Sequence, residues 1–150
     1  MPSESARMNS SAEARFRVPT PAAVARVVKV IALDSACDAI VARLAERSWG
    51  GATFFPASAA RDRSGRAIDD IAAGDLVVML AAAGADVPAA AAIGRACSDR
   101  RVHTATFVVR TALATDEQLS RTLAQVRPWS LMVVIVSDDN DVEDILGSFR

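Results

Sequence analysis

The chain has few of the residues that most enzyme sites need. His103 is its one histidine, which nearly excludes a serine-type catalytic triad or a metal site built from several histidines. Its two cysteines, Cys37 and Cys97, are far apart on predicted helices, so they form neither a redox motif nor a zinc-binding cluster. We therefore interpret both as small hydrophobic residues of the core.

Long apolar runs and a large net charge are also missing. No apolar stretch approaches the roughly 20 residues of a membrane-spanning helix, and the amino terminus lacks the hydrophobic region of a secretory signal. The 17 basic and 18 acidic side chains nearly cancel, so no strongly basic surface for nucleic acid is expected. These absences predict a cytoplasmic protein without a membrane or nucleic-acid partner.

The 150 residues are enough for one domain. Residues 1–23 are rich in Ser, Ala, Arg, Glu and Pro without a sustained apolar period, and they predict a disordered amino-terminal arm. In residues 24–150, short β-branched runs alternate with Ala- and Leu-rich helical stretches. This alternation is typical of βαβ units and predicts one domain, a three-layer Rossmann-like α/β sandwich with a mostly parallel sheet.

The pattern predicts ten regular elements. Strands are expected at Val27–Leu33, Thr53–Phe55, Asp75–Leu80, Thr104–Val109 and Leu131–Val136. Helices are expected at Ser35–Ser48, Arg66–Ala73, Pro88–Asp99, Asp116–Val126 and Val142–Phe149, with Thr115 as a cap and Ala57–Gly65 as a solvated loop. The first, third, fourth and fifth strands are nearly continuous apolar runs, so we expect all four to be buried.

Glycine is absent from the junction between the first strand and the first helix. The junction reads Leu33-Asp34-Ser35-Ala36-Cys37-Asp38. Dinucleotide- and GTP-binding folds place glycines at this point, because the backbone N–H groups of the helix start must approach a phosphate closely. Two carboxylates would lie here where the negative charge of a phosphate belongs. The junction therefore predicts negligible GTP binding.

The order of elements and three stretches of sequence resemble the amino-terminal, nucleotide-binding half of the tubulin/FtsZ family of GTPases. The stretches are VKVIALDSACDAIVARLAERSWGGATFF, GRAIDDIAAGDLVVMLAAAGADVPAAAAIGRACSDRRVHTATFVVR and LSRTLAQVRPWSLMVVIVSDDNDVEDIL. The first resembles the family's opening strand, phosphate loop, helix and second strand. The second resembles its third strand and signature glycine loop, with the flanking helices and the next strand. The third resembles the region where a helix leads to a strand that ends in a short turn, here Asn140-Asp141. The resemblance covers most of residues 26–146 and implies a reduced domain of this family.

The chain departs from this family where the family binds and hydrolyses nucleotide. The string at the glycine loop, Ala81-Ala82-Ala83-Gly84-Ala85-Asp86, is shorter and has one glycine. The connection after Phe55 is short, and the chain stops near Phe149, where the family continues into a second domain that drives hydrolysis. The resemblance therefore implies no GTPase activity from this chain alone. The family's longitudinal self-association implies a homo-oligomer or a protein partner.

One crevice is the candidate binding site, because ligands of open parallel sheets bind outside the carboxyl ends of the strands, where the strand order reverses. With a central first strand, it is lined by Asp34, Ser35, Gly84, Ala85, Asp86 and Asp138, together with Ser137 and Asp139. Its four carboxylates would repel phosphate and could attract Mg²⁺ or Ca²⁺. Alternatively, Asp34 or Ser35 caps the helix, and the acidic run after Ser137 solvates a turn at a helix start. No catalytic residue, metal site or cofactor is predicted.

Two classes of function remain open. The leading hypothesis is a non-catalytic binding or assembly module, with contacts through the helix face at Ala89–Cys97 or the ends near Trp49 and Trp129. The alternative interpretation of both tryptophans is that they cover the edge of the core. The second hypothesis is a small-molecule enzyme or sensor, because GDLVVMLAAAGADVPAAAAIGRACSDRRVHTATFVV is similar to sugar-isomerase-type domains. Such domains hold a sugar phosphate with loop hydroxyls, and Ala81–Ala85 has none.

Overall fold

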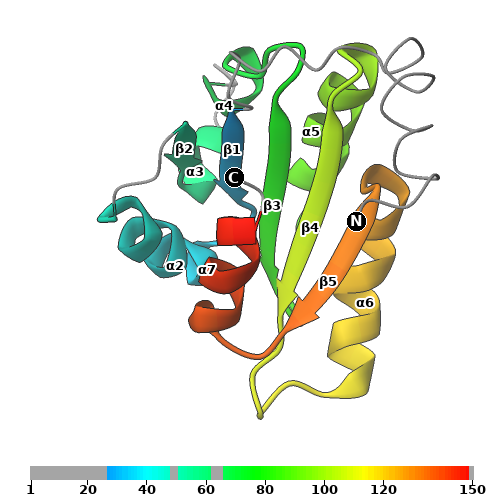
Figure 1. Ribbon diagram of the computed structural model, residues 1–150. Helices are drawn as coiled ribbons and strands as arrows, with labels where there is room; N and C mark the ends of the chain where they lie inside the picture. Colours follow the sequence, from blue (N-terminus) through cyan, green and yellow to red (C-terminus); the bar gives the residue numbers. More distant parts are fainter. Residues whose placement is uncertain (1–26, 48–50, 62–65, 149–150) are drawn as a thin grey trace, which may run out of the picture.

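A five-stranded sheet with all strands parallel forms the centre of the computed structural model, which describes residues 27–47, 51–61 and 66–148 (Figure 1). Its strands are β1 (Val28–Ala32), β2 (Ala52–Phe55), β3 (Leu76–Ala82), β4 (His103–Val109) and β5 (Met132–Val136). The spatial order is β2-β1-β3-β4-β5, the flavodoxin-like order of doubly wound α/β folds. The predicted fold class is confirmed, while the predicted arm at residues 1–23 lies outside the described residues.

Helices cover both faces of this sheet and make the outer two layers. They are α2 (Ser35–Ala45), α3 (Ala57–Arg61), α4 (Arg66–Asp69), α5 (Ala89–Asp99), α6 (Asp116–Val126) and α7 (Asp139–Ser148), with a short 3-10 helix, η2 (Arg127–Trp129), after α6. One face packs against α2 and α7, and the other against α3, α4, α5 and α6. The two crossovers that leave β1 and β3 therefore go to opposite faces.

The core has two halves, one on each side of the sheet. Alternation along β1 sends Val30 and Ala32 toward α2 and α7, and Ile31 and Leu33 toward α3 and α5. β1, β3 and β4 are buried over nearly their whole length, as their apolar runs predict. In the described residues, no buried side-chain nitrogen or oxygen is without a hydrogen-bond partner.

The helix-start signals in the sequence are confirmed in α6. The Thr115 hydroxyl accepts a hydrogen bond from the Gln118 N–H at 3.1 Å, and the Gln118 side chain accepts one from the Thr115 N–H at 3.0 Å. This capping box satisfies two backbone donors that the helix cannot satisfy itself. α6 accordingly has the bounds that the sequence predicts, Asp116 to Val126.

The connection between β2 and β3 differs from the prediction. The expected loop at Ala57–Gly65 begins as a helix, α3, because its alanines are buried and Asp38 accepts the Ala57 N–H at 2.7 Å. The expected helix Arg66–Ala73 ends early, at Asp69. There the Ala72 N–H bonds to Asp75 at 2.8 Å instead of to a helical carbonyl. The Arg100 guanidinium also donates to the carbonyls of Ile68 and Ile71, so contacts between distant segments bear on both boundaries.

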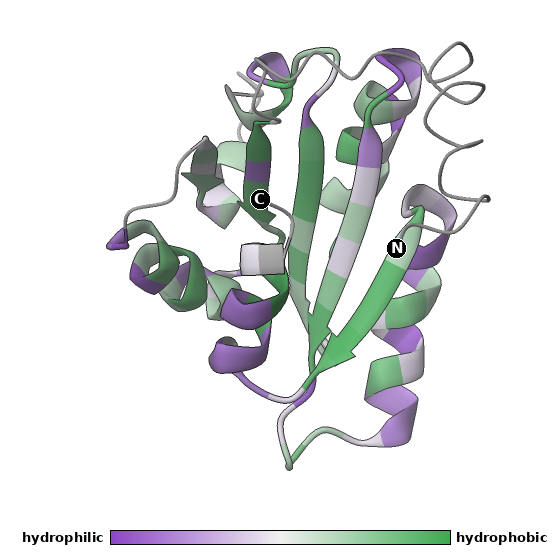
Figure 2. Cartoon of the chain, viewed as in Figure 1, coloured by the Kyte–Doolittle hydropathy of each residue, from purple (hydrophilic) through white to green (hydrophobic). Residues whose placement is uncertain are grey.

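The expected burial of the fifth strand is wrong. β5 is the last strand of the sheet, and only Val136 of its five residues is buried. Met132 and Ile135 are 41% and 49% exposed. Figure 2 shows that β5 is hydrophobic along its length although it lies at the edge. An apolar run indicates a buried strand only if a neighbour lies on each side, and β5 has one described neighbour, β4.

The helix whose outward face was expected to mediate assembly, α5, packs its other face inside the fold. The residues of α5 that face the sheet are buried: Ala89, Ala90, Ile93, Gly94 and Cys97. Trp129 packs against this core cluster and lies under the Arg95 guanidinium, 5.4 Å from the ring centroid. The structure thus supports the interpretation of Trp129 as a cover on the core edge. Trp49 lies outside the described residues.

Gly94 allows Trp129 to pack on α5, and this yields a test of the packing. A Cβ at position 94 would overlap the Trp129 side chain, so we expect Gly94→Ala to lower the free energy of unfolding by about 1–3 kcal/mol. Urea denaturation followed by circular dichroism measures the loss. Gly147→Ala is the matched control, because nothing lies within 4 Å of its added methyl group. Equal stability of the two variants would contradict the packing.

Candidate functional site

The sheet has one topological switch point, between β1 and β3. The connections that follow these two strands lead to opposite faces, to α2 and to α5, so the carboxyl ends of β1 and β3 flank the position where such folds bind ligands. The condition under which the sequence placed the crevice here, a first strand inside the sheet, is met, because β1 lies between β2 and β3. The residues at these two strand ends decide what can bind there.

Asp34 occupies the position between the two strand ends with its own carboxylate. One oxygen accepts the Cys37 N–H in the first turn of α2 at 3.0 Å. The other oxygen accepts the Ala82 N–H at the end of β3 at 2.8 Å. The side chain is therefore the N-cap of α2 and also joins β1 to β3. A helix start that otherwise attracts anions is here neutralised by an internal anion.

The loop after β3 turns away from this position and binds to α6. The Gly84 N–H donates to the Thr122 hydroxyl at 2.9 Å, and the Val87 N–H donates to the Gln125 side chain at 2.7 Å. The Ala85 N–H bonds within the turn. Gly84 has φ +92°, the left-handed conformation that favours glycine. Three backbone donors of this loop, which a phosphate would need, are thus already used.

The acidic residues after β5 serve the start of α7. Asp138 accepts the Asp141 N–H at 3.0 Å, and Asp141 accepts the Ser137 N–H at 3.1 Å. These bonds support the interpretation of the acidic run as a helix start. Within the described ranges, no group of three or more His, Cys, Asp or Glu side chains is placed to hold a metal ion.

The structure therefore brings only some of the predicted site residues together. Asp34 lies against the end of β3, and Ser35 is exposed in the first turn of α2. Gly84 and Ala85 are half-buried against α6, whereas Asp86 is exposed. Asp138 follows β5, which β3 and β4 separate from β1, so it belongs to a different part of the edge.

Both cysteines are buried, as the sequence predicts. Burial raises the pKa of the Cys37 thiol far above its usual range, and the charge of Asp34 raises it further. Burial also raises the pKa of Cys97, to about 11, although the nearby Arg100 charge opposes this shift. Since the thiolate is the nucleophile, neither group is suited to covalent catalysis at neutral pH.

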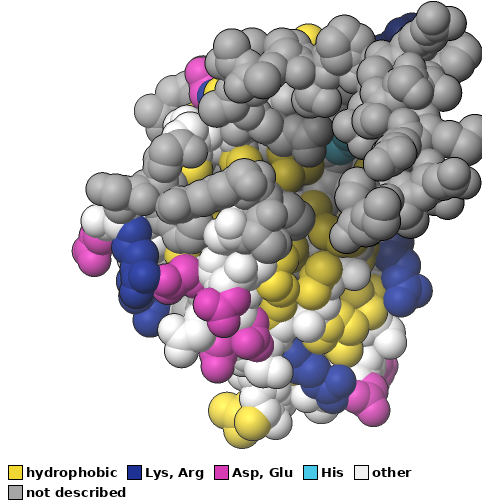
Figure 3. All heavy atoms as spheres, viewed as in Figure 1, with side chains coloured by type: hydrophobic (Ala, Val, Ile, Leu, Met, Phe, Trp, Pro, Cys, Tyr) yellow, Lys and Arg dark blue, Asp and Glu magenta, His cyan; other side chains and the backbone are white. Residues whose placement is uncertain are grey.

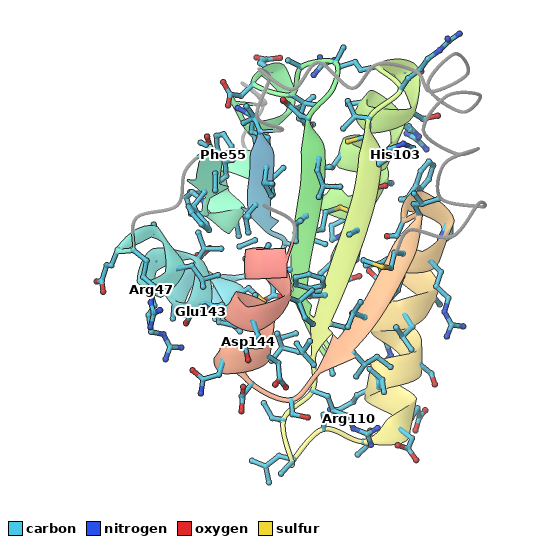
Figure 4. The ribbon with its side chains drawn as sticks, in the orientation of Figure 1. Arg47, Phe55, His103, Arg110, Glu143 and Asp144 are labelled. Atoms are coloured by element: carbon cyan, nitrogen blue, oxygen red, sulfur yellow. The ribbon has the colours of Figure 1, made fainter. Side chains whose placement is uncertain are left out.

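A shallow hollow lies at the opposite end of the sheet, near the start of β4. It has a volume of about 330 Å³ and is lined by Gly94, Ser98, His103, Trp129, Ser130 and Leu131, among others. His103 stands at the first position of β4 (Figure 4). Ser130 donates to the Val126 carbonyl at 2.7 Å and also pairs with Thr106. Its hydroxyl is thus used by the fold.

The exposed apolar residues around β5 are the surface feature that sequence reasoning missed. Leu131 is 74% exposed, Ile135 is 49% exposed and Met132 is 41% exposed. The only available signal was the apolar run itself, which equally fits a central strand. Which of the two environments applies depends on the strand order, and the strand order is a property of the tertiary structure.

Comparison with known protein families and curated proteins does not identify this chain. No protein-family model matches the chain, and no curated protein matches it in sequence. No helix in the described part of the chain is long and apolar enough to cross a membrane.

The double role of Asp34 yields a stability test. We expect Asp34→Ala to lower the free energy of unfolding by about 2 kcal/mol, because the helix cap is lost and the Ala82 N–H loses its partner. Urea denaturation measures the change. Ser35→Ala, at the exposed neighbouring position, is the control and should change stability by less than about 0.5 kcal/mol. If both variants lose the same stability, Asp34 does not join the strand ends.

The raised pKa values of the thiols predict their reactivity. In the native protein at pH 8, both thiols stay protonated and shielded, so an aromatic disulfide reagent should react with them very slowly. In denaturant, the same reagent should release two equivalents of chromophore per chain. Rapid labelling of the native protein, with its circular dichroism spectrum unchanged, would contradict this assignment.

Proposed function

We propose that this protein is a non-catalytic binding or assembly module, a reduced tubulin/FtsZ-like domain that keeps the Rossmann-like sheet without nucleotide binding. The observation that carries the proposal is the carboxylate of Asp34 at the switch point, bonded to the N–H groups of Cys37 and Ala82. This is where a nucleotide-binding relative would place a phosphate.

Electrostatics and geometry both oppose a phosphate at this position. A bound phosphate would meet the negative charge of Asp34 at close range, and removing that carboxylate would take the side-chain cap from α2 and leave the Ala82 N–H without its partner. The donors of the loop after β3 are taken by Thr122 and Gln125. Binding would therefore require both strand ends to rearrange.

The surface properties favour a protein partner. Three of the four large exposed hydrophobic residues in the described chain, Leu131, Met132 and Ile135, lie in β5 or directly before it. Apolar surface of this kind is common at contacts between proteins. The small-molecule alternative has no comparable support. Its loop at Ala81–Ala85 has no hydroxyl side chain, and the Thr122 hydroxyl beside it is fully buried and already bonded to the loop backbone.

Isothermal titration of the full chain with GTP and Mg²⁺ tests this proposal. We expect no heat of binding with micromolar or tighter affinity and no release of phosphate, because the anion position is already filled. Asp34→Asn serves as a comparison, since it removes the charge and keeps the size of the side chain. Micromolar affinity of the unmodified chain, or measurable hydrolysis, would overturn the proposed function whatever the oligomeric state.

A further inference from the structure

We propose that the outer edge of β5, which pairs with no other described strand, binds a second copy of this chain, whose own β5 pairs with it in antiparallel orientation. The two sheets would then form one ten-stranded sheet. This inference rests on the proposed function, because it names the partner and the surface of the assembly module.

β5 lacks the features by which edge strands avoid pairing. Its residues, Met132 to Val136, include no charged side chain and no proline. Its register with β4 runs through all five residues without a bulge. Charges, prolines and bulges are the usual protection of an exposed edge, because a row of free N–H and C=O groups is a template for another strand. In the described chain, only β4 pairs with β5.

The exposed hydrophobic residues lie on both faces of this edge. Val133 packs toward the core on the α6 side, and Val134 packs toward the core on the α7 side. By alternation, Ile135 projects to the α6 side and Met132 to the α7 side. Figure 3 shows hydrophobic side chains gathered over β4 and β5 on the side that faces the viewer. A helix docked on one face would cover one set, whereas an added strand covers both.

Charge complementarity favours a second copy in antiparallel orientation. Arg127 is exposed at the start of η2, the 3-10 helix that precedes β5, and Asp138 is exposed two residues after β5. If two copies of β5 pair around Val134, the central residue, the segment before each strand, with Arg127, faces the segment after the other strand, with Asp138. Val133 of each copy then lies opposite Ile135 of the other. The same patch is thus complementary to itself, as a twofold interface requires.

The interface is expected to be small, because it consists of one short strand and its flanking residues. Standard stable interfaces bury about 1,200–2,000 Å² in total, so a contact of this size should give a dimer that dissociates on dilution. We therefore expect a monomer–dimer equilibrium in the micromolar range.

Sedimentation velocity of the full chain over a micromolar concentration series is the first test. We expect Ile135→Lys to raise the dimer dissociation constant at least about tenfold, because it places a charge at the edge. Leu113→Lys is the matched control, since Leu113 is 92% exposed in the loop after β4, and it should leave the equilibrium unchanged. A strict monomer at high micromolar concentration, or equal behaviour of the two variants, overturns the proposal.

A second pair of variants addresses the orientation without touching the strand. Arg127→Glu should weaken the dimer, because it brings a negative charge beside Asp138 of the second copy, and the effect should fade in high salt. Arg121→Glu, at an exposed position of α6, should have no such effect. These surface changes keep the test valid even if Ile135→Lys does not fold. Equal affinity of both variants overturns the antiparallel arrangement.

Hydrogen exchange separates a second copy from other occupants of the edge. Protection of the β5 amides that increases with protein concentration supports the proposal. Strong protection of both edges of β5 at concentrations where the chain is monomeric means that another segment of the same chain covers the strand, and this overturns it. An oligomer that persists in Ile135→Lys would also overturn the edge contact, yet it would leave the proposed assembly function intact.

Discussion

The carboxylate of Asp34 joins three elements of this fold through two hydrogen bonds. Asp34 lies two residues after the end of β1, one of its carboxylate oxygens caps α2, and the other accepts the N–H of Ala82, the last residue of β3. These elements meet at the switch point, where the strand order reverses and the helices that follow β1 and β3 lie on opposite faces of the sheet. A divergence of this kind exposes backbone donors, and a charged acceptor satisfies two of them with charge-assisted bonds.

The same donors cannot stabilise the fold and bind a ligand at once. In nucleotide-binding relatives of this layout, glycines leave the helix start open, and the phosphate supplies the negative charge. Here the protein supplies that charge itself, and the loop after β3 is tied to Thr122 and Gln125 of α6. Stability at the carboxyl edge and loss of phosphate binding are therefore two consequences of one arrangement.

β5 presents the opposite situation, because its composition suits a more buried position than the one it occupies. Three apolar side chains in and beside it are substantially exposed, and the strand has no charge to keep it in water. Burying such surface is favourable by roughly 25 cal/mol per Å² of apolar area, so this edge gains from association more than the charged helix surfaces do. The binding site of the module and its most apolar exposed strand are, in our proposal, the same feature.

The sequence predicted the local part of the candidate site and not the part that depends on distant residues. That Asp34 caps a helix follows from its place just before Ser35 and an apolar helical pattern, a relation over a few residues. That it also bonds to Ala82 involves a residue 48 positions away, and no local pattern encodes that distance. The buried state of Cys37 and Cys97 was predictable from helix periodicity, whereas the contact between Gly94 and Trp129 was not.

The sequence by itself determined the class of the fold, the order of strands and helices along the chain, and the bounds of elements with strong local signals, such as α6 and its Thr115 cap. These properties depend on periodicity and capping, which act between residues close in the chain. The tertiary structure decided which strand lies at the edge, where α3 and α4 begin and end, and where the backbone donors of the phosphate loops are used. Each of these depends on contacts between distant segments, and such contacts exist only once the sheet has assembled.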